Sequence, residues 1–204
     1  MKINIKPTDS LNYQSLLSLE NSDIVANKFQ LDVQDIDLEL VSQYLGKDSA
    51  IIFSKPKTTG EEYAIKEQYR KAGASAWGKV SELKLTSFSF ESSATEVNTI
   101  CFLEGLFLAS YKFDQHLSKK AEIVDIEISQ ELATSSLFVE ITNLVLASTW
   151  TKNMVNEPVN ILNTQQFSAE MIAMGKDAGF EVEVLEKKQI EALKMGGLLA
   201  VNKG

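Results

Sequence analysis

The spacing of apolar positions changes repeatedly along the chain, from every second residue to every third or fourth. The two-residue period predicts strands, and the longer period predicts helices. Strands are expected over residues 1–6, 23–31 (as a strand or one arm of a hairpin), 50–53, 82–90 and 121–128. Helices are expected over residues 35–45, 59–79, 93–111 and 135–155. This alternation predicts an α/β fold with a mixed sheet flanked by helices.

Short motifs indicate where two of these helices begin and where one of them packs closely against another element. Thr59 with Glu62, and Ser93 with Glu96, have the three-residue spacing of a capping box. Gly105 lies inside the helix that follows Ser93, and a glycine there indicates the close approach of another element. The first two motifs therefore predict helix starts, and Gly105 predicts a tight packing contact.

The longest predicted helix covers residues 135–155 and leads into a joint around Pro158. A hydroxyl side chain from Thr134, Ser135 or Ser136 is expected to cap its start. Pro158 closes the region, because the residue before a proline avoids the helical conformation.

A second, shorter series of elements follows the joint. Residues 163–178 predict a helix capped by Asn163 and ended by Gly179. Residues 180–185 alternate as a strand, and residues 187–194 predict a short helix. Residues 198–201 form a continuous apolar run that, as a strand, would need neighbours on both faces. These few elements cannot bury that run, so we expect it to pack on the first domain or to belong to a sheet that this chain lacks.

The predicted organisation therefore has three parts. Residues 1–134 form an N-terminal domain, residues 135–156 an interdomain helix, and residues 157–204 the first βα elements of a second domain, which is expected to be truncated. The sequence contains no internal repeat and no low-complexity linker.

Composition narrows the classes of function. The chain has 204 residues, a net charge of −8, one cysteine and one histidine. A negative surface repels phosphates, so we expect no nucleic-acid partner, although a local basic patch stays open at this point. No apolar run approaches the roughly 20 residues that span a bilayer, and the N-terminus carries no signal-peptide pattern. We therefore expect no membrane partner and a cytoplasmic location.

Several polar positions could carry chemistry. A group of four carboxylates could bind a hard cation, although no glycine lies among them to form a tight ligand loop, and a solvated acidic face is the simpler interpretation. The group consists of Asp32, Asp35, Asp37 and Glu39. Gly196 and Gly197 lack the spacing of a phosphate loop and are interpreted as a turn. Asn156 and Asn160 flank Pro158, where they could fix the chain's path or contact a ligand.

Four further side chains are candidates for reactive groups. His116 follows a predicted helix and could be a general acid or base, or an exposed loop residue. Cys101 lies on an apolar helical stripe, which is typical of a buried, inert thiol. Glu104 and Asp114 could form a carboxylate pair for acid–base chemistry. The structural alternative is that Glu104 pairs with a backbone amide or with Lys112.

Three segments, in their order along the chain, resemble the leucyl aminopeptidase (cytosol aminopeptidase) family. Residues 156–165 are similar to the family's approximate Asn-x-Pro-x-Asn-x-Leu-Thr-Pro pattern, with Asn163-Thr164-Gln165 replacing the Leu-Thr-Pro ending in part, so that the proline is lost. Residues 195–204 are similar to Met-Gly-x-x-Leu-Ala-Val-x-x-Gly, and residues 104–114 to Glu-Gly-x-x-Leu-x-x-Tyr-x-Phe-Asp. The resemblance covers the chain from residue 97 onward, and the earlier residues share only the order of elements.

The resemblance implies a macro-domain-like N-terminal domain, a connecting helix and a catalytic domain. That domain would hold two divalent metal ions, zinc or manganese, which activate the water that attacks the first peptide bond. The resemblance also implies peptide substrates and a homo-oligomer, a hexamer, for the parent enzyme. The family's metal-ligand segments, Lys-Gly-x-x-x-Asp-Ser-Gly-Gly and Asn-Thr-Asp-Ala-Glu-Gly-Arg, are absent from this sequence. No catalytic, cofactor-binding or metal-ligating residue is therefore assigned, and this chain alone is expected to be inactive.

Two other functions stay open at this point. A macro-like domain could bind ADP-ribose or another nucleotide, although the glycines of the first domain are scattered rather than gathered in a phosphate loop. The chain could also be a non-catalytic regulatory subunit.

Overall fold

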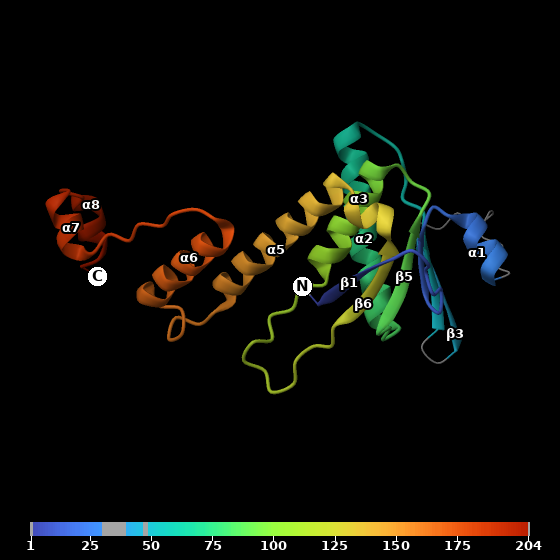
Figure 1. Ribbon diagram of the computed structural model, residues 1–204, viewed down its shortest axis with the longest axis horizontal. Coiled ribbons are helices and arrows are strands. Elements are labelled where there is room, and N and C mark those ends of the chain that lie inside the picture. Colours follow the sequence, from blue (N-terminus) through green and yellow to red (C-terminus); the bar gives the residue numbers. More distant parts are fainter. Residues whose placement is uncertain (1, 30–39, 47–48, 204) are drawn as a thin grey trace. The chain divides into compact units, whose positions relative to one another are not determined.

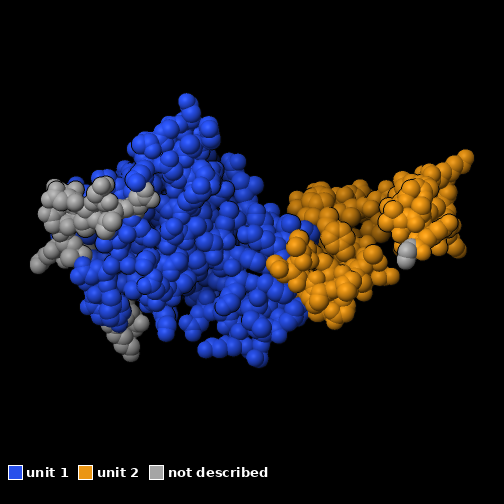
Figure 2. Space-filling view, turned by 180° about the vertical axis from the view of Figure 1, so that it is seen from behind, with its two compact units in different colours: residues 1–153 blue, residues 154–204 orange. Residues whose placement is uncertain are grey.

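The computed structural model describes residues 2–29, 40–46 and 49–203. The chain divides into two compact units, which cover residues 1–153 and 154–204 (Figure 2). The first unit contains the sheet and its covering helices, and the described part of the second unit is helical.

A six-stranded sheet forms the centre of the first unit (Figure 1). In spatial order its strands are β1 (Ile3–Thr8), β6 (Val124–Ser129), β5 (Ser87–Ser92), β2 (Leu16–Leu19), β4 (Ser49–Ser54) and β3 (Leu40–Gly46). All neighbours are parallel except β3, which runs antiparallel to β4 at the edge. The mixed sheet predicted from the sequence is therefore confirmed.

Helices cover the sheet unequally. The described helices of this unit are α1 (Ser22–Phe29), α2 (Glu62–Glu82), α3 (Glu96–Ala109), α4 (Gln130–Thr134) and α5 (Ser136–Asn156), and α5 ends just beyond the boundary at residue 153. Figure 1 shows α2, α3 and α5 on one side of the sheet and α1 on the other. The main core lies on the side of α2 and α3, and a smaller apolar cluster lies under α1.

The two-residue period of the strands explains these two cores. Leu17 of β2 lies in the main core, whereas Leu16 belongs to the cluster with Val25 of α1. In β4, Ile52 faces the main core and Ile51 faces the smaller cluster. Successive side chains of a strand point to opposite faces, so a short apolar run with buried neighbours on both sides serves both cores.

β1 and β6 follow a different pattern, with apolar side chains on one face only. Ile126 is buried, whereas the alternate Asp125 is half-buried and accepts hydrogen bonds from Asn4 at 2.8 Å and from Lys6 at 2.6 Å. These bonds join the polar faces of two adjacent strands. This alternation carried the correct sequence prediction of strands near residues 1–6 and 121–128.

Several predicted elements and one cap are confirmed. The strand over residues 50–53 is β4, and the helices over residues 59–79, 93–111 and 135–155 correspond to α2, α3 and α5. Ser135 caps α5, because its hydroxyl accepts a hydrogen bond of 3.1 Å from the amide of Phe138. Two short elements, β2 and α4, were not predicted.

Two predictions near the N-terminus are wrong. Residues 23–31 were expected to form a strand, but Ser22–Phe29 is helix α1, with Asp23 favourably placed in its first turn. Residues 35–45 were expected to form a helix, but Leu40–Gly46 is strand β3; residues 35–39 lie outside the described part. β3 pairs with β4, and a neighbouring edge overrides a weak helical period.

The helix starts and the turn before β5 also differ from the predictions. Glu61 is the N-cap of α2 without a side-chain bond, and Thr59 instead offers its carbonyl to the Gln68 amide. The hydroxyl of Thr95, rather than Ser93, caps α3. The strand expected over residues 82–90 begins only at Ser87, because α2 continues to Glu82 and ends in a tight turn.

The second unit contains α6 (Thr164–Ala178), α7 (Lys187–Ala192) and α8 (Gly196–Val201). Asn163 caps α6, and Gly179 ends it with a φ of 80°, as predicted. Residues 180–185 and 198–201 were expected to be strands, but the former lie outside regular structure and the latter belong to α8. A strand needs a neighbour for its backbone hydrogen bonds, and the described part of this unit contains none.

Candidate functional site

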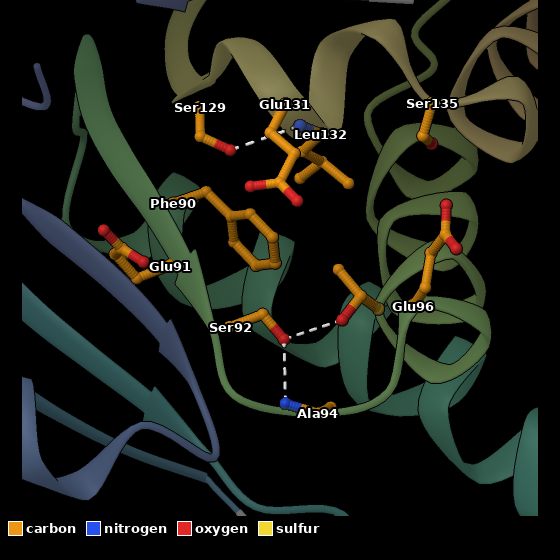
Figure 3. Close-up of a pocket in the computed structure, with 10 residues that line it drawn as sticks. Phe90, Glu91, Ser92, Ala94, Glu96, Ser129, Glu131, Leu132 and Ser135 are labelled. Atoms are coloured by element: carbon orange, nitrogen blue, oxygen red, sulfur yellow. Dashed lines mark hydrogen bonds between the residues drawn. The ribbon is translucent and has the colours of Figure 1, made fainter. Parts of the chain in front are cut away.

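The first candidate is a cavity of about 340 Å³ at the carboxyl ends of β5 and β6 (Figure 3). The two strands are parallel neighbours, so the loops that follow them meet at one edge of the sheet. Phe90 and Leu132 supply apolar lining, and the Glu131 side chain extends from α4 toward Phe90 (Figure 3). Position alone would suit a ligand, since α/β sheets bind ligands at this edge.

The amide groups beside this cavity are already occupied. α3, α4 and α5 all begin near it, and the amides at helix starts can bind anions. However, Ser129 accepts a hydrogen bond from the amide of Leu132 at 3.3 Å, and Ser135 does the same for Phe138 at 3.1 Å. The side-chain caps thus use amides that a bound phosphate would need.

The charge of the cavity also opposes a phosphate ligand. Glu91, Glu96 and Glu131 line it, and no lysine or arginine of the described chain does so. Glu91 accepts a hydrogen bond of 2.6 Å from the hydroxyl of Tyr13, and burial together with this carboxylate raises the pKa of Tyr13 to about 12. Tyr13 therefore stays neutral and leaves the negative charge of Glu91 in place.

Glu104 does not belong to an acid–base pair in this structure. Its carboxylate accepts a hydrogen bond of 2.6 Å from Arg70 Nε across the contact between α2 and α3. The predicted alternatives were a backbone amide or Lys112, and the observed partner is instead Arg70. Cys101 lies one turn earlier and is buried, and burial raises the pKa of its thiol. It has the properties of the inert thiol that was predicted.

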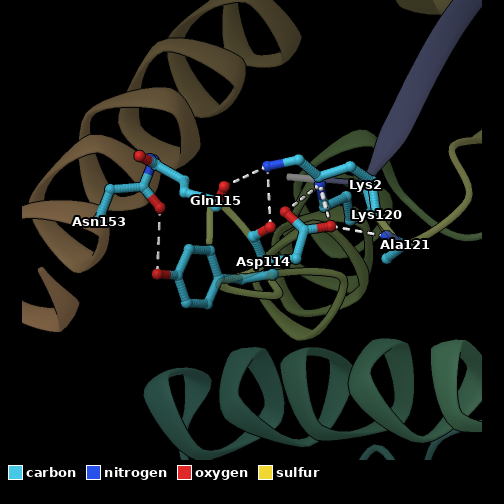
Figure 4. A network of polar contacts seen from close by, with 7 residues as sticks. Lys2, Asp114, Gln115, Lys120, Ala121 and Asn153 are labelled. Carbon is cyan, nitrogen blue, oxygen red and sulfur yellow. Dashed lines mark hydrogen bonds and ion pairs between the residues drawn. The ribbon is translucent and has the colours of Figure 1, made fainter. Parts of the chain in front are cut away.

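Asp114 lies in a polar network at the other end of the first unit (Figure 4). It accepts hydrogen bonds from Lys2 Nζ at 2.8 Å and from the amide of Ala121 at 2.6 Å. These contacts tie the segment after α3 to the start of β1. Glu104 and Asp114 thus have different partners. His116 is exposed and lies against the ring of Phe113.

Replacing Asp114 with asparagine should change how stability depends on pH. The hydrogen bond from Lys2, and next the amide of Ala121, hold the pKa of Asp114 below its ordinary value. Such a carboxylate stabilises the fold above its unfolded pKa of about 3.9, and this stabilisation is lost as pH falls through the lower folded pKa. The stability gap between wild type and Asp114→Asn should therefore be wide near about pH 6 and narrow near about pH 3.

Urea unfolding midpoints at the two pH values test this expectation. Asp177→Asn is the control, because Asp177 is exposed on α6 and forms no ion pair with any described residue. The control should match wild type at both pH values. An equal gap for Asp114→Asn at both pH values would contradict the assignment.

The remaining candidates do not converge on a site. Gly196 and Gly197 were interpreted as a turn, but they are the first two residues of helix α8, so this prediction is wrong. Asn156 ends α5, and Asn160 is exposed in the following turn. The acidic group at residues 32–39 lies outside the described residues.

A two-metal centre needs several histidine, cysteine or carboxylate side chains close together. Among residues 2–29, 40–46 and 49–203, no three histidine, cysteine or carboxylate side chains are close enough together to hold a metal ion. The described residues therefore do not fit a two-metal centre. In the same part of the chain, none of the helices combines the length and the apolar character needed to cross a bilayer.

Comparison with known proteins decides the family. Residues 149–204 match the sequence pattern of the catalytic domain of the cytosol aminopeptidase family. A probable cytosol aminopeptidase of Chlorobium limicola is 35% identical over 162 residues, which are 67% of this chain and 32% of the relative. A second probable cytosol aminopeptidase, from Sulfurihydrogenibium sp., is 33% identical over 138 residues, which are 62% of this chain and 27% of the relative. The chain belongs to the cytosol aminopeptidase family.

Solved structures agree on the fold. A mutant of tomato leucine aminopeptidase has a TM-score of 0.70 at 15% identity, covering 94% of this chain and 46% of that chain. The bottromycin maturation enzyme BotP in complex with Mn has a TM-score of 0.64 at 13% identity, covering 89% and 40%. The chain thus spans about a third of the curated relatives named above and less than half of these solved structures.

Proposed function

We propose that this chain is the N-terminal portion of a metal-dependent aminopeptidase that removes N-terminal amino acids from peptides. The observation that carries the proposal is the family match, which places residues 149–204 within the pattern of a catalytic domain. The first unit, with its own core of α2, α3 and the sheet, would be the N-terminal domain. Its proposed roles are to support oligomer assembly, as a hexamer, and to shape access to the active site.

The burial pattern of the second unit supports the same proposal. Gly175 is the only fully buried residue among its described residues, whereas Phe167, Ile172 and Leu198 are 46%, 50% and 56% exposed. Apolar side chains so exposed in a compact unit call for a partner surface. We propose that the remainder of a catalytic domain supplies that surface.

The proposed metal ions would number two, zinc or manganese, and would supply an activated water for peptide hydrolysis. The described residues of this chain do not fit such a centre, so no step of the reaction is assigned to them. We propose that ligands come from the two family segments that this sequence lacks. The protein would act on peptides in the cytoplasm.

The ADP-ribose alternative gains no support from the first cavity. A diphosphate there would face three carboxylates and capped helix starts, and like charges in a partly buried site repel strongly. The structure therefore favours the aminopeptidase over a nucleotide-binding module that uses the carboxyl edge of the sheet.

An activity assay tests the proposal directly. The 204-residue chain, incubated with Mn²⁺ or Zn²⁺ and leucine p-nitroanilide, should release no p-nitroaniline. A longer form of the same protein that includes both metal-ligand segments should release it, and a chelator should stop the release. Chelator-sensitive turnover by the 204-residue chain would overturn the assignment of the metal site to the missing segments. An inactive longer form would overturn the proposed function itself.

A further inference from the structure

A second cavity, of about 450 Å³, lies at the opposite edge of the sheet from the first. It forms where α2 and α3 end and where β6 begins, and Trp77, Val80 and Leu85 provide apolar lining. Five lysines surround it: Lys2, Lys84, Lys112, Lys119 and Lys120. We call this cavity the basic pocket, and it is unusual in a chain whose net charge is −8.

The basic pocket stays positively charged after the carboxylate of its described lining, the ion pair of Lys2 and the two nearby helix ends are counted. Glu122 is the one carboxylate in its described lining, and Asp114 is bonded to Lys2, so three of the five lysine charges stay unmatched. The carboxyl ends of α2 and α3 each add about half a negative charge. About two positive charges therefore remain after the two helix ends have been offset.

The lysines divide into two groups by their contacts. Lys2 and Lys120 are structural: Lys2 bonds the Asp114 carboxylate, and Lys120 donates to the Asp114 carbonyl at 2.9 Å (Figure 4). Lys84, Lys112 and Lys119 are exposed and form no ion pair with any described residue. Lys84, Lys112 and Lys119 are therefore available to a ligand. The bonds of Lys2 and Lys120 to Asp114 fix the part of the pocket lining in which Lys112 and Lys119 lie.

The position of Lys84 is set by the turn that ends α2. Its backbone has a φ of 53°, and its amide bonds the carbonyl of Ser81 at 3.2 Å. The next amide, of Leu85, bonds the carbonyl of Val80 at 3.1 Å, and both of these side chains are buried. This pair of bonds is the Schellman arrangement, which holds the residue rigidly at the end of the helix.

We propose that the basic pocket binds a small ligand that carries two or more adjacent phosphate groups, such as a nucleoside triphosphate or a short polyphosphate. Lysine ammonium groups serve as adaptable point charges for phosphate. The cavity has the volume of a small-molecule site. An extended nucleic acid is disfavoured because the chain as a whole carries a net charge of −8, which repels a long run of phosphates.

Calorimetric titration of the 204-residue chain with ATP, tripolyphosphate and adenosine tests this proposal. Both phosphate compounds should bind, with affinity that falls as salt is raised, and adenosine should not. Equal affinity for ATP and tripolyphosphate would mean that the pocket recognises the phosphates alone. Tighter binding of ATP would mean that the pocket also contacts the base. Failure of both phosphate compounds to bind, or adenosine binding as well as ATP, would overturn the proposal.

Two triple variants separate the pocket from the overall charge. Lys84→Asn, Lys112→Gln and Lys119→Gln together should weaken tripolyphosphate binding by at least about tenfold. The control combines Lys194→Asn, Lys187→Gln and Lys188→Gln, which remove the same charge from exposed positions on the second unit. Lys194 matches Lys84 closely, because it also follows a helix with a φ of 54°.

The control should bind within about twofold of wild type, and both variants should keep the wild-type melting temperature. Equal weakening of tripolyphosphate binding in the two variants would show that binding responds to the net charge of the chain, and it would overturn the proposed binding site. Tighter binding of a single-stranded 20-mer than of tripolyphosphate, lost with the same three lysines, would replace the small ligand with a nucleic acid.

Discussion

A single methyl group at position 105 is expected to destabilise the first unit by about 3 kcal/mol or more. A Cβ atom on Gly105 would lie 1.9 Å from the carbonyl oxygen of Arg70 and 2.6 Å from its carbonyl carbon. The contact is reciprocal, because a Cβ on Gly73 would lie 1.9 Å from the carbonyl oxygen of Phe102. The two helix backbones therefore touch at paired glycines, and no flexible side chain can yield.

The surroundings of α3 prevent the helices from moving apart cheaply. Phe102, Leu103 and Leu106 are fully buried, and Phe102 stacks on Phe90 of β5 with ring centroids 5.9 Å apart. Shifting α3 away from α2 would disturb this packing, and tightly packed interiors resist such shifts.

Thermal unfolding followed by circular dichroism measures the effect. Gly105→Ala should lower the melting temperature by about 10 °C, given the usual 2–4 °C per kcal/mol for a unit of this size. Gly78→Ala is the control on α2, because nothing lies within 4 Å of its added Cβ. It should stabilise the helix by about 0.5–1 kcal/mol. A Gly105→Ala variant with the same melting temperature as wild type would contradict the proposed effect of the backbone contact.

The sequence predicted best those elements whose signal is internal to the segment. α5 is long, capped by Ser135 and followed by Pro158, and each of these features acts locally. The same holds for α6, with Asn163 at its start and Gly179 at its end. Gly105 correctly indicated a close approach, although its partner, Arg70, lies 35 positions away and carries no sequence signal.

Elements that depend on partners were predicted less well. Residues 40–46 form a strand because β4 offers an edge, and no local pattern announces that edge. Residues 180–185 alternate cleanly, yet they lack a neighbouring strand in the described part of the second unit. Alternation therefore indicated a capacity for pairing rather than the pairing itself.

The same distinction applies to the candidate sites. Motifs near Pro158 and Met195 indicated the family, because they are contiguous in sequence. The basic pocket was not located from the sequence, because Lys2, Lys84 and Lys119 are far apart in the chain and the net charge of −8 says nothing about where a local basic patch lies. Only the fold brings these cations together.

Residues 158–204, separated from the rest of the chain, are expected to lose nearly all helical structure. Among its described residues, the second unit buries only Gly175 fully. α7 and α8 have 6 residues each and α6 has 15, and isolated helices of fewer than roughly 12–15 residues are marginal in water. Local caps such as Asn163 supply only about 1 kcal/mol each, which is too little to replace a core.

The complementary piece, residues 1–157, should keep the melting temperature of the full chain within about 3 °C, because the core of the first unit draws its residues from positions up to Val145. Circular dichroism at 222 nm measures both pieces under the same conditions. A cooperative transition in the 158–204 peptide would contradict the prediction. Loss of structure in that peptide would show that these residues, which match a catalytic-domain pattern, do not fold without surfaces outside residues 158–204.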